Sequence, residues 1–134
     1  MVSRPTEPTW LTRVVVNAFH TDQVREHGGL LGVRDENGLE SALARPRHKW
    51  LYEPATDLAA LGAAYAFGLA RNHPYNDGNK RVALVAMLTF LAINGRDIDA
   101  ADDDLLTTML ALAAGHLTEP ELAAWLRPRM VPLK

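Results

Sequence analysis

A polar stretch near the middle of the chain combines side chains that are suited to chemistry on a phosphate group. It reads His-Pro-Tyr-Asn-Asp-Gly-Asn-Lys-Arg from His73 to Arg81. A histidine is a base that works near neutral pH, so His73 is suited to take a proton from an attacking hydroxyl. Asp77 offers the hard oxygen ligands that Mg²⁺ shares with phosphate oxygens. The stretch therefore indicates a general base and a metal ligand within one loop.

The residues after Asp77 are suited to hold an anion. Gly78 lets the backbone approach a phosphate without a clash from Cβ. The main-chain N–H groups of Gly78, Asn79 and Lys80 would be unpaired donors in the first turn of a helix. Lys80 adds a positive charge, and the guanidinium of Arg81 binds two phosphate oxygens at once. Two cations at a helix N-terminus oppose the helix dipole, a cost that a bound anion would remove.

The segment that follows, Val82–Ile93, is apolar apart from Thr89. A helix that is apolar on every face must be buried on every face. The run is shorter than the roughly 20 residues that cross a bilayer, so it is predicted to be a central core helix. The polar stretch would lie at the N-terminus of this helix, where unpaired N–H groups and the helix dipole attract anions.

Caps, apolar spacing and breakers predict about six helices and an all-α fold. Besides the central helix, the predicted helices cover about 13–26, 38–45, 57–72, 103–114 and 119–127. The expected N-caps are Thr12, Asp35 or Asn37, Thr56, Asp102 or Asp103, and Thr118, the last with Glu121 at capping-box spacing. Pro46 is expected to end the second helix, leaving 46–56 irregular. No segment alternates polar and apolar residues as a half-buried strand would.

The composition limits the class of protein. The chain has 134 residues, 48% of them apolar, with a net charge of −2 and no cysteine. This length predicts one compact domain over 10–134, preceded by a flexible arm at 1–9. The slight negative charge does not indicate direct binding to nucleic acid, and the lack of cysteine excludes thiolate chemistry. Without an apolar leader or spanning segment, a cytoplasmic protein that does not bind membranes is expected.

The stretch from His73 to Arg81 resembles the signature loop of the Fic/Doc superfamily in its Doc (death-on-curing) form, His-x-Phe-x-Asp-(Gly/Ala)-Asn-Lys-Arg. Further matching positions are His20, Gly28-Gly29, Gly32, 39–46, Asn72, 90–91 and Asn94-Gly95. The resemblance implies a single-domain Fic/Doc helical bundle that uses ATP and Mg²⁺. It assigns the base to His73, the Mg²⁺ ligand to Asp77, the anion hole to Gly78, Asn79 and Lys80, and phosphate binding to Arg81.

The residue at position 80 decides which activity the resemblance implies. Fic enzymes with Gly-Asn-Gly-Arg transfer AMP, whereas this chain has Lys80 in place of the second glycine. A long cation there would crowd the usual position of the β- and γ-phosphates. Doc proteins hold ATP reversed and act as kinases on a threonine of elongation factor Tu, which stops translation. Tyr75 replaces the phenylalanine of the Doc pattern, and its extra buried hydroxyl is expected to disturb the loop packing slightly.

Fic proteins often carry an inhibitory Ser/Thr-x-x-x-Glu-(Gly/Asn) motif, and this sequence lacks it. The resemblance therefore implies a toxin of a type II toxin–antitoxin system that is inhibited by a separate Phd-like antitoxin. AMP transfer to a protein hydroxyl is one alternative. A non-catalytic co-regulator that binds the antitoxin is another.

The remaining histidines are not expected to be catalytic. His20 lies on the first predicted helix, where a core or hydrogen-bonded role is expected, and His27, His48 and His116 are predicted at the surface. The basic residues Arg45, Arg47, His48 and Lys49 suggest either contact with an acidic partner or nucleotide, or simply a solvated loop.

Overall fold

A computed structural model describes residues 6–134, and residues 1–5 of the predicted arm lie outside the described part. Its elements are α1 (Arg13–His27), α2 (Glu36–Tyr52), α3 (Leu58–Asn72), α4 (Asn79–Ile93), β1 (Arg96–Ile98), α5 (Asp102–Ala113), α6 (Glu119–Leu126), a 3₁₀ turn (Arg127–Arg129) and β2 (Met130–Pro132). The predicted all-α class is confirmed. Within 6–134, no helix is both long enough and apolar enough to span a membrane.

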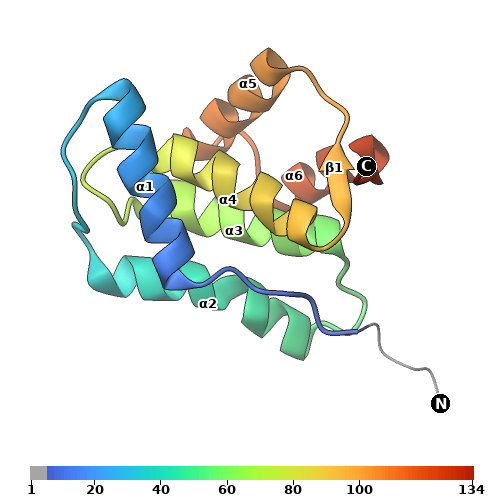
Figure 1. Ribbon diagram of the computed structural model, residues 1–134. Coiled ribbons are helices and arrows are strands. Elements are labelled where there is room, and N and C mark those ends of the chain that lie inside the picture. Colours follow the sequence, from blue (N-terminus) through green and yellow to red (C-terminus); the bar gives the residue numbers. More distant parts are fainter. Residues whose placement is uncertain (1–5) are drawn as a thin grey trace.

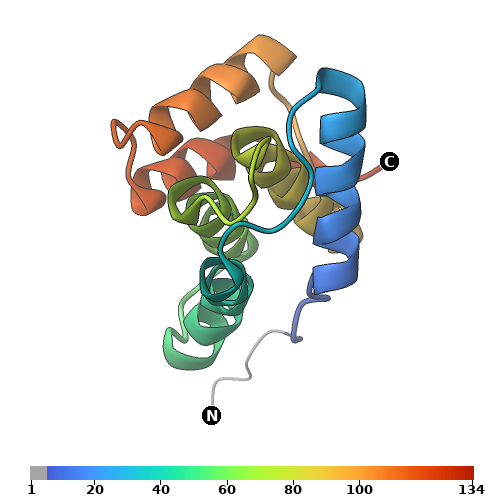
Figure 2. The same cartoon turned by 90° about the vertical axis from the view of Figure 1, so that its left-hand side faces the viewer.

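The centre of the fold is the pair α3 and α4, with α3 lying between α2 and α4 (Figure 1). Two glycines of α3 make this close packing possible. A Cβ on Gly68 would lie 3.0 Å from the Cα of Ala42 in α2, and one on Gly62 would lie 3.3 Å from Leu91 in α4. Viewed from the side in Figure 2, α1 and α5 flank α4. The segment predicted to be catalytic therefore joins the two most enclosed helices.

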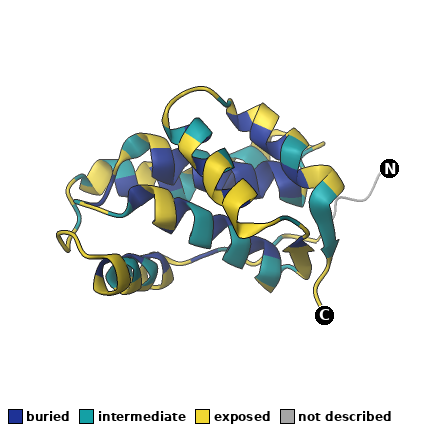
Figure 3. Ribbon diagram, turned by 90° about the horizontal axis from the view of Figure 1, so that it is seen from above, coloured by how far each residue is buried: buried dark blue, intermediate teal, exposed yellow. Residues whose placement is uncertain are grey.

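The apolar segment of α4 forms much of the core, as predicted. Val82, Met87 and Phe90 are fully buried, and only Ile93 at the end of the helix is exposed. Figure 3 shows buried residues gathered in the central helices and exposed residues on the outer turns. Trp10 of the N-terminal segment stacks on the buried Phe90, with ring centroids 5.9 Å apart, and so covers one end of the core.

The second helix is longer than predicted, because it continues through Pro46 to Tyr52. Proline has no N–H, so the C=O of Ala42 lacks its helical partner. For this reason an internal proline is normally taken to end a helix. Here Leu39, Ala42 and Pro46 are all buried, and Ala42 lies against Gly68 of α3. This packing compensates for the lost hydrogen bond, so the prediction of an irregular 46–56 was wrong for 46–52.

The helix caps confirm some predictions and correct others. Thr12, Asp35 and Thr118 cap α1, α2 and α6 as expected, and Thr118 forms a full capping box with Glu121. Asp57 caps α3 by accepting from the N–H of Ala60 at 2.9 Å.

Two predicted caps were wrong. The hydroxyl of Thr56 is buried and finds no partner among the described residues, because the neighbouring Asp57 takes the capping position. The N-cap of α5 is Ala101, which offers no side-chain acceptor, and Asp102 and Asp103 instead lie in the first turn. There their charges still favour the helix dipole.

A small antiparallel sheet, absent from the prediction, pairs β1 with β2 through Ile98 and Met130. Strands of three residues are too short to show alternation in a sequence. Near it, Thr9 of the predicted arm exchanges two hydrogen bonds with the Asn94 side chain, at 2.8 and 3.0 Å.

Candidate active site

The loop between α3 and α4 contains the predicted base and metal ligand. His73 is the C-cap of α3 and adopts a left-handed conformation with φ 46° and ψ 54°. A non-glycine residue pays about 1–2 kcal/mol for this conformation, and such strain is concentrated at functional sites. Gly78, with φ 79°, is the N-cap of α4. Both ends of the loop are thus fixed in unusual backbone geometry.

Asn79 closes the loop from inside. Its side-chain oxygen accepts from the N–H of Tyr75 at 2.9 Å, and its side-chain nitrogen donates to the C=O of Tyr75 at 2.9 Å. Both residues are buried. Because this side chain is buried and hydrogen-bonded within the loop, the main-chain N–H of Asn79 is the group assigned to the predicted anion hole.

Tyr75 anchors the loop to α1. Its ring stacks on His20 with centroids 4.2 Å apart, and its hydroxyl donates to the side-chain oxygen of Asn17 at 2.6 Å. Burial raises the pKa of this hydroxyl to about 12. The extra hydroxyl therefore has a hydrogen-bond partner, and the slight disturbance of the loop packing stays a prediction. The sequence analysis did not predict this role for Asn17. Asn17 and His20 are polar residues three positions apart on α1, and this spacing was a usable signal.

Arg34 holds the backbone around the predicted base. Its side chain donates to the C=O of His73 from Nε at 3.1 Å and from Nη2 at 2.6 Å. The main-chain N–H groups of Arg34 and Asp35 both donate to the C=O of Pro74. Nothing in the local sequence distinguished Arg34 from any exposed arginine, because its partner lies 39 positions away.

A glycine-containing loop, residues 28–32, lies beside the predicted catalytic loop, residues 73–78 (Figures 1 and 2). The N–H of Leu30 donates to Oδ2 of Asp77 at 2.6 Å. The side chain of Asn76 donates to the C=O of Leu31 at 3.0 Å, and the N–H of Asn76 donates to the C=O of Gly32 at 3.0 Å. The loop over 28–32 therefore forms a second wall of the site.

His20 is buried, with 3% exposure, and hydrogen-bonded, as predicted for a non-catalytic residue. Its Nε2 accepts from the N–H of Gly32 at 3.0 Å. Burial lowers the pKa of His20, against an opposing effect of the Asp77 main chain and carboxylate. Nδ1 is nevertheless buried without a hydrogen bond of ordinary geometry to any residue in 6–134.

The groups assigned to acid–base chemistry and phosphate binding remain accessible. His73, Lys80 and Arg81 are exposed, and their side chains form no hydrogen bond or ion pair within residues 6–134. No side chain caps the N-terminus of α4 at Gly78. One end of the α3–α4 pair thus presents an imidazole, the carboxylate of Asp77, two cations and the positive end of a helix.

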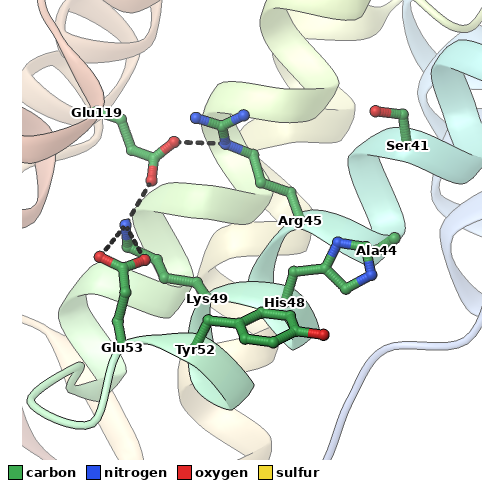
Figure 4. A pocket seen from close by; sticks show the side chains of 8 residues that line it. All are labelled: Ser41, Ala44, Arg45, His48, Lys49, Tyr52, Glu53 and Glu119. Atoms are coloured by element: carbon green, nitrogen blue, oxygen red, sulfur yellow. Dashed lines mark hydrogen bonds and ion pairs between the residues drawn. The ribbon is translucent and has the colours of Figure 1, made fainter.

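A separate cavity of about 410 Å³ lies along the C-terminal half of α2 (Figure 4). There the buried carboxylate of Glu119 binds Arg45 at 2.6 Å and Lys49 at 3.3 Å. The guanidinium of Arg45 also lies over the Phe67 ring, 4.6 Å from its centroid. No residue of the predicted catalytic loop lines this cavity. Two members of the basic run therefore join α2 to α6, whereas His48 is exposed.

The helical fold places a loop containing an exposed histidine directly ahead of the uncapped N-terminus of α4. The model of the Fic/DOC family matches residues 10–91, which include this loop and the helices on both sides of it. The chain therefore belongs to the Fic/DOC family, and the resemblance seen in the sequence is confirmed.

Two relatives extend the match. "Protein kinase doc" of Escherichia phage P1 is 34% identical over 110 residues, which cover 82% of this chain and 86% of the relative. "Toxin Doc" of Mycolicibacterium smegmatis (strain ATCC 700084 / mc(2)155) is 43% identical over 83 residues, covering 57% of this chain and 64% of the relative.

Proposed function

We propose that this chain is the toxin of a toxin–antitoxin system and a protein kinase that uses ATP and Mg²⁺. Its substrate would be a serine or threonine hydroxyl of an elongation factor Tu-like translation factor, and phosphorylation would arrest translation. The observation that carries the proposal is the exposed His73 in the loop that leads to the uncapped N-terminus of α4, whose first turn carries Lys80 and Arg81. The relative named as a protein kinase supports the reaction type.

The chemistry assigned to the loop is a single in-line phosphoryl transfer. The substrate hydroxyl oxygen forms a bond to the γ-phosphorus of ATP, and the bond from that phosphorus to the bridging oxygen breaks, releasing ADP. His73 accepts the hydroxyl proton. The first-turn N–H groups of α4, with Lys80 and Arg81, hold the phosphate oxygens and balance their charge.

Asp77 is the residue suited to hold Mg²⁺. Its carboxylate is exposed, and Leu30 occupies only Oδ2, so Oδ1 remains available as a hard oxygen ligand. A bound Mg²⁺ would neutralise charge on the ATP phosphates. The N–H of Leu30 fixes the orientation of the carboxylate, which reduces the reorganisation needed for binding.

An antitoxin partner follows from the same site. The chain carries no inhibitory Ser/Thr-x-x-x-Glu-(Gly/Asn) motif, while the groups proposed for transfer are exposed. We propose that a Phd-like antitoxin covers this end of α4 and blocks access to His73. A second protein that folds a disordered segment onto the site would provide the inhibition that the chain itself lacks.

The test is transfer of label to purified elongation factor Tu in the presence of Mg²⁺. Parallel reactions contain ATP labelled at the α- or at the γ-phosphate, with the His73→Ala variant as the matched control. Label from γ alone, lost in the variant, is expected. Label from α would indicate AMP transfer instead. No label with intact antitoxin binding would indicate a non-catalytic co-regulator and refute the kinase proposal.

A further inference from the structure

We infer that His20 is a positioning residue that holds the 28–32 loop against the catalytic loop and thereby orients the Asp77 carboxylate. This inference deepens the proposed function, because it gives α1 a part in presenting the metal ligand. His20 does not touch the proposed substrates, since its ring is buried.

The first step is the anchor that His20 provides. Its Nε2 accepts from the main-chain N–H of Gly32 at 3.0 Å, which places the proton of the neutral ring on Nδ1. Its ring lies almost parallel to Tyr75, with an interplanar angle of 15° and centroids 4.2 Å apart. One side chain of α1 therefore holds both loops, one by a hydrogen bond and the other by stacking.

The second step leads from Gly32 to Asp77. Two residues before the anchored Gly32, the N–H of Leu30 donates to Oδ2 of Asp77 at 2.6 Å. The two loops are closely packed here, because a Cβ on Gly29 would lie 2.9 Å from the Cβ of Asp77. Loss of the anchor at Gly32 would therefore loosen the donor at Leu30 and the carboxylate that it orients, while the two hydrogen bonds from Asn76 to Leu31 and Gly32 would still join the loops.

The third step concerns the burial of the His20 ring, because Gly32 itself is exposed. The N–H of Gly32 donates to Nε2 of the buried His20 ring, so removal of this acceptor would leave a part-buried N–H without its protein partner. The opposite side of the ring lies near Asp77, which favours the protonated form, yet Nδ1 makes no regular hydrogen bond to any described residue. The Nε2 acceptor is thus the working atom of this side chain.

Two substitutions separate the acceptor from the bulk of the side chain. In His20→Gln the amide oxygen can reach the position of Nε2, whereas in His20→Asn the shorter amide reaches only the position of Nδ1. His20→Phe keeps the ring on Tyr75 but removes the acceptor. The three variants also differ in folding, so the free energy of unfolding is measured for each.

The first readout is amide hydrogen exchange followed by NMR, which requires no substrate. His20→Asn and His20→Phe are expected to speed exchange at Leu30 and Gly32 by about two- to tenfold, the loss of one hydrogen bond. His20→Gln is expected to stay near the wild type. Leu69, fully buried in α3, is the internal control. Equal acceleration at Leu69, or identical behaviour of the Gln and Asn variants, would overturn the inference.

The second readout is the Mg²⁺ concentration that half-saturates γ-phosphoryl transfer. His20→Asn is expected to raise this concentration, while the KM for the protein substrate stays constant. A change in the protein KM alone would contradict the role at Asp77. If the wild type transfers no label but the exchange pattern appears, the proposed kinase function fails and the positioning of the loop stands.

Discussion

The side-chain amide of Asn79 bridges both main-chain polar groups of Tyr75, with each hydrogen bond at 2.9 Å. The family resemblance assigns Asn79 to an anion hole, yet its side chain points into the loop and its exposure is 8%. The side chain therefore makes no direct contact with the proposed phosphate site, where only the main-chain N–H of Asn79 would act. It fixes the turn that directs the first N–H groups of α4 outward.

Replacing Asn79 with Ala is expected to destabilise the fold by about 2–4 kcal/mol. The N–H and C=O of Tyr75 would both be buried without partners, and each such group costs about 1–3 kcal/mol. Urea unfolding followed by circular dichroism measures the change. Asn37→Ala is the control, because Asn37 is exposed on the first turn of α2. Equal midpoints for the two variants would show that the bridge contributes nothing.

The strained backbone of His73 allows function and stability to be separated. His73→Gly relieves about 1–2 kcal/mol of left-handed strain and loses about 0.5–1 kcal/mol through greater freedom of the unfolded chain. His73→Ala keeps the strain. Both variants are expected to abolish transfer, with the Gly variant about 1 kcal/mol more stable than the Ala variant. Thermal unfolding compares them, and an Ala variant as stable as the Gly variant would contradict the strain.

Removal of the Tyr75 hydroxyl is expected to weaken the fold while sparing the chemistry. Tyr75→Phe leaves the side-chain oxygen of Asn17 without its donor, at a cost of about 0.5–1.5 kcal/mol. The ring and its stacking on His20 remain, so γ-phosphoryl transfer by the folded fraction is expected to persist. A double-mutant cycle with Asn17→Ala measures the coupling. A coupling energy of zero would mean that the hydrogen bond contributes no stability.

Sequence reasoning located α4 and its loop because their signals are local. A long apolar run needs no partner to be recognised, and the His73–Arg81 stretch is contiguous. The end of α2 was different, since Pro46 is tolerated only through packing of Ala42 on Gly68 of another helix. No window of the sequence around Pro46 contains that contact.

The same distinction applies within the site. The glycine positions and the buried role of His20 were readable, but the attachment of Leu30 to Asp77 spans 47 positions and uses a main-chain donor that every residue has. The N-cap of α3 also depends on a distant residue. Asp57 and not Thr56 takes the capping position, and the carboxylate of Asp57 also binds Arg127 at 2.6 Å. Such pairings are set by the fold and not by residue type.

The lowered pKa of His20 predicts a pH-dependent stability. Burial favours the neutral ring in the folded state, so the unfolded chain binds the proton more readily. Neutral His20 does not reduce the free energy of unfolding above about pH 6.5, the pKa of a histidine in the unfolded chain. As the pH falls from there toward the lower pKa of His20 in the folded state, protonation of the unfolded chain reduces the free energy of unfolding. The free energy of unfolding should decrease from about pH 7.5 to pH 5.5, and His20→Gln should flatten this decrease. His116→Gln, at an exposed position, should retain it.

The ion pairs around Glu119 are expected to stabilise the fold without taking part in transfer. The Glu119 side chain is 8% exposed and neutralises Arg45 and Lys49, whereas Glu53 binds Lys49 from an exposed position. Burial favours neutral Lys49, but the hydrogen bonds and charges of Glu53 and Glu119 raise its pKa overall. Both cations keep contact with water, so Glu119→Ala should cost about 1–3 kcal/mol, less than the loss of a fully buried pair. Glu53→Ala, which removes an exposed partner of the same lysine, should cost less than about 1 kcal/mol.

Measurement of γ-phosphoryl transfer separates this network from the site. Because no residue of the proposed catalytic loop lines the cavity at Glu119, the folded Glu119→Ala protein should transfer label at the wild-type rate. A loss of transfer with unchanged stability would instead show that the cavity binds a reactant. The pair of variants also tests the contact between α2 and α6, because Glu119 is the first residue of α6 and both Arg45 and Lys49 belong to α2. If both variants have the same free energy of unfolding as the wild type, the packing of α6 depends on its apolar face and not on these ion pairs.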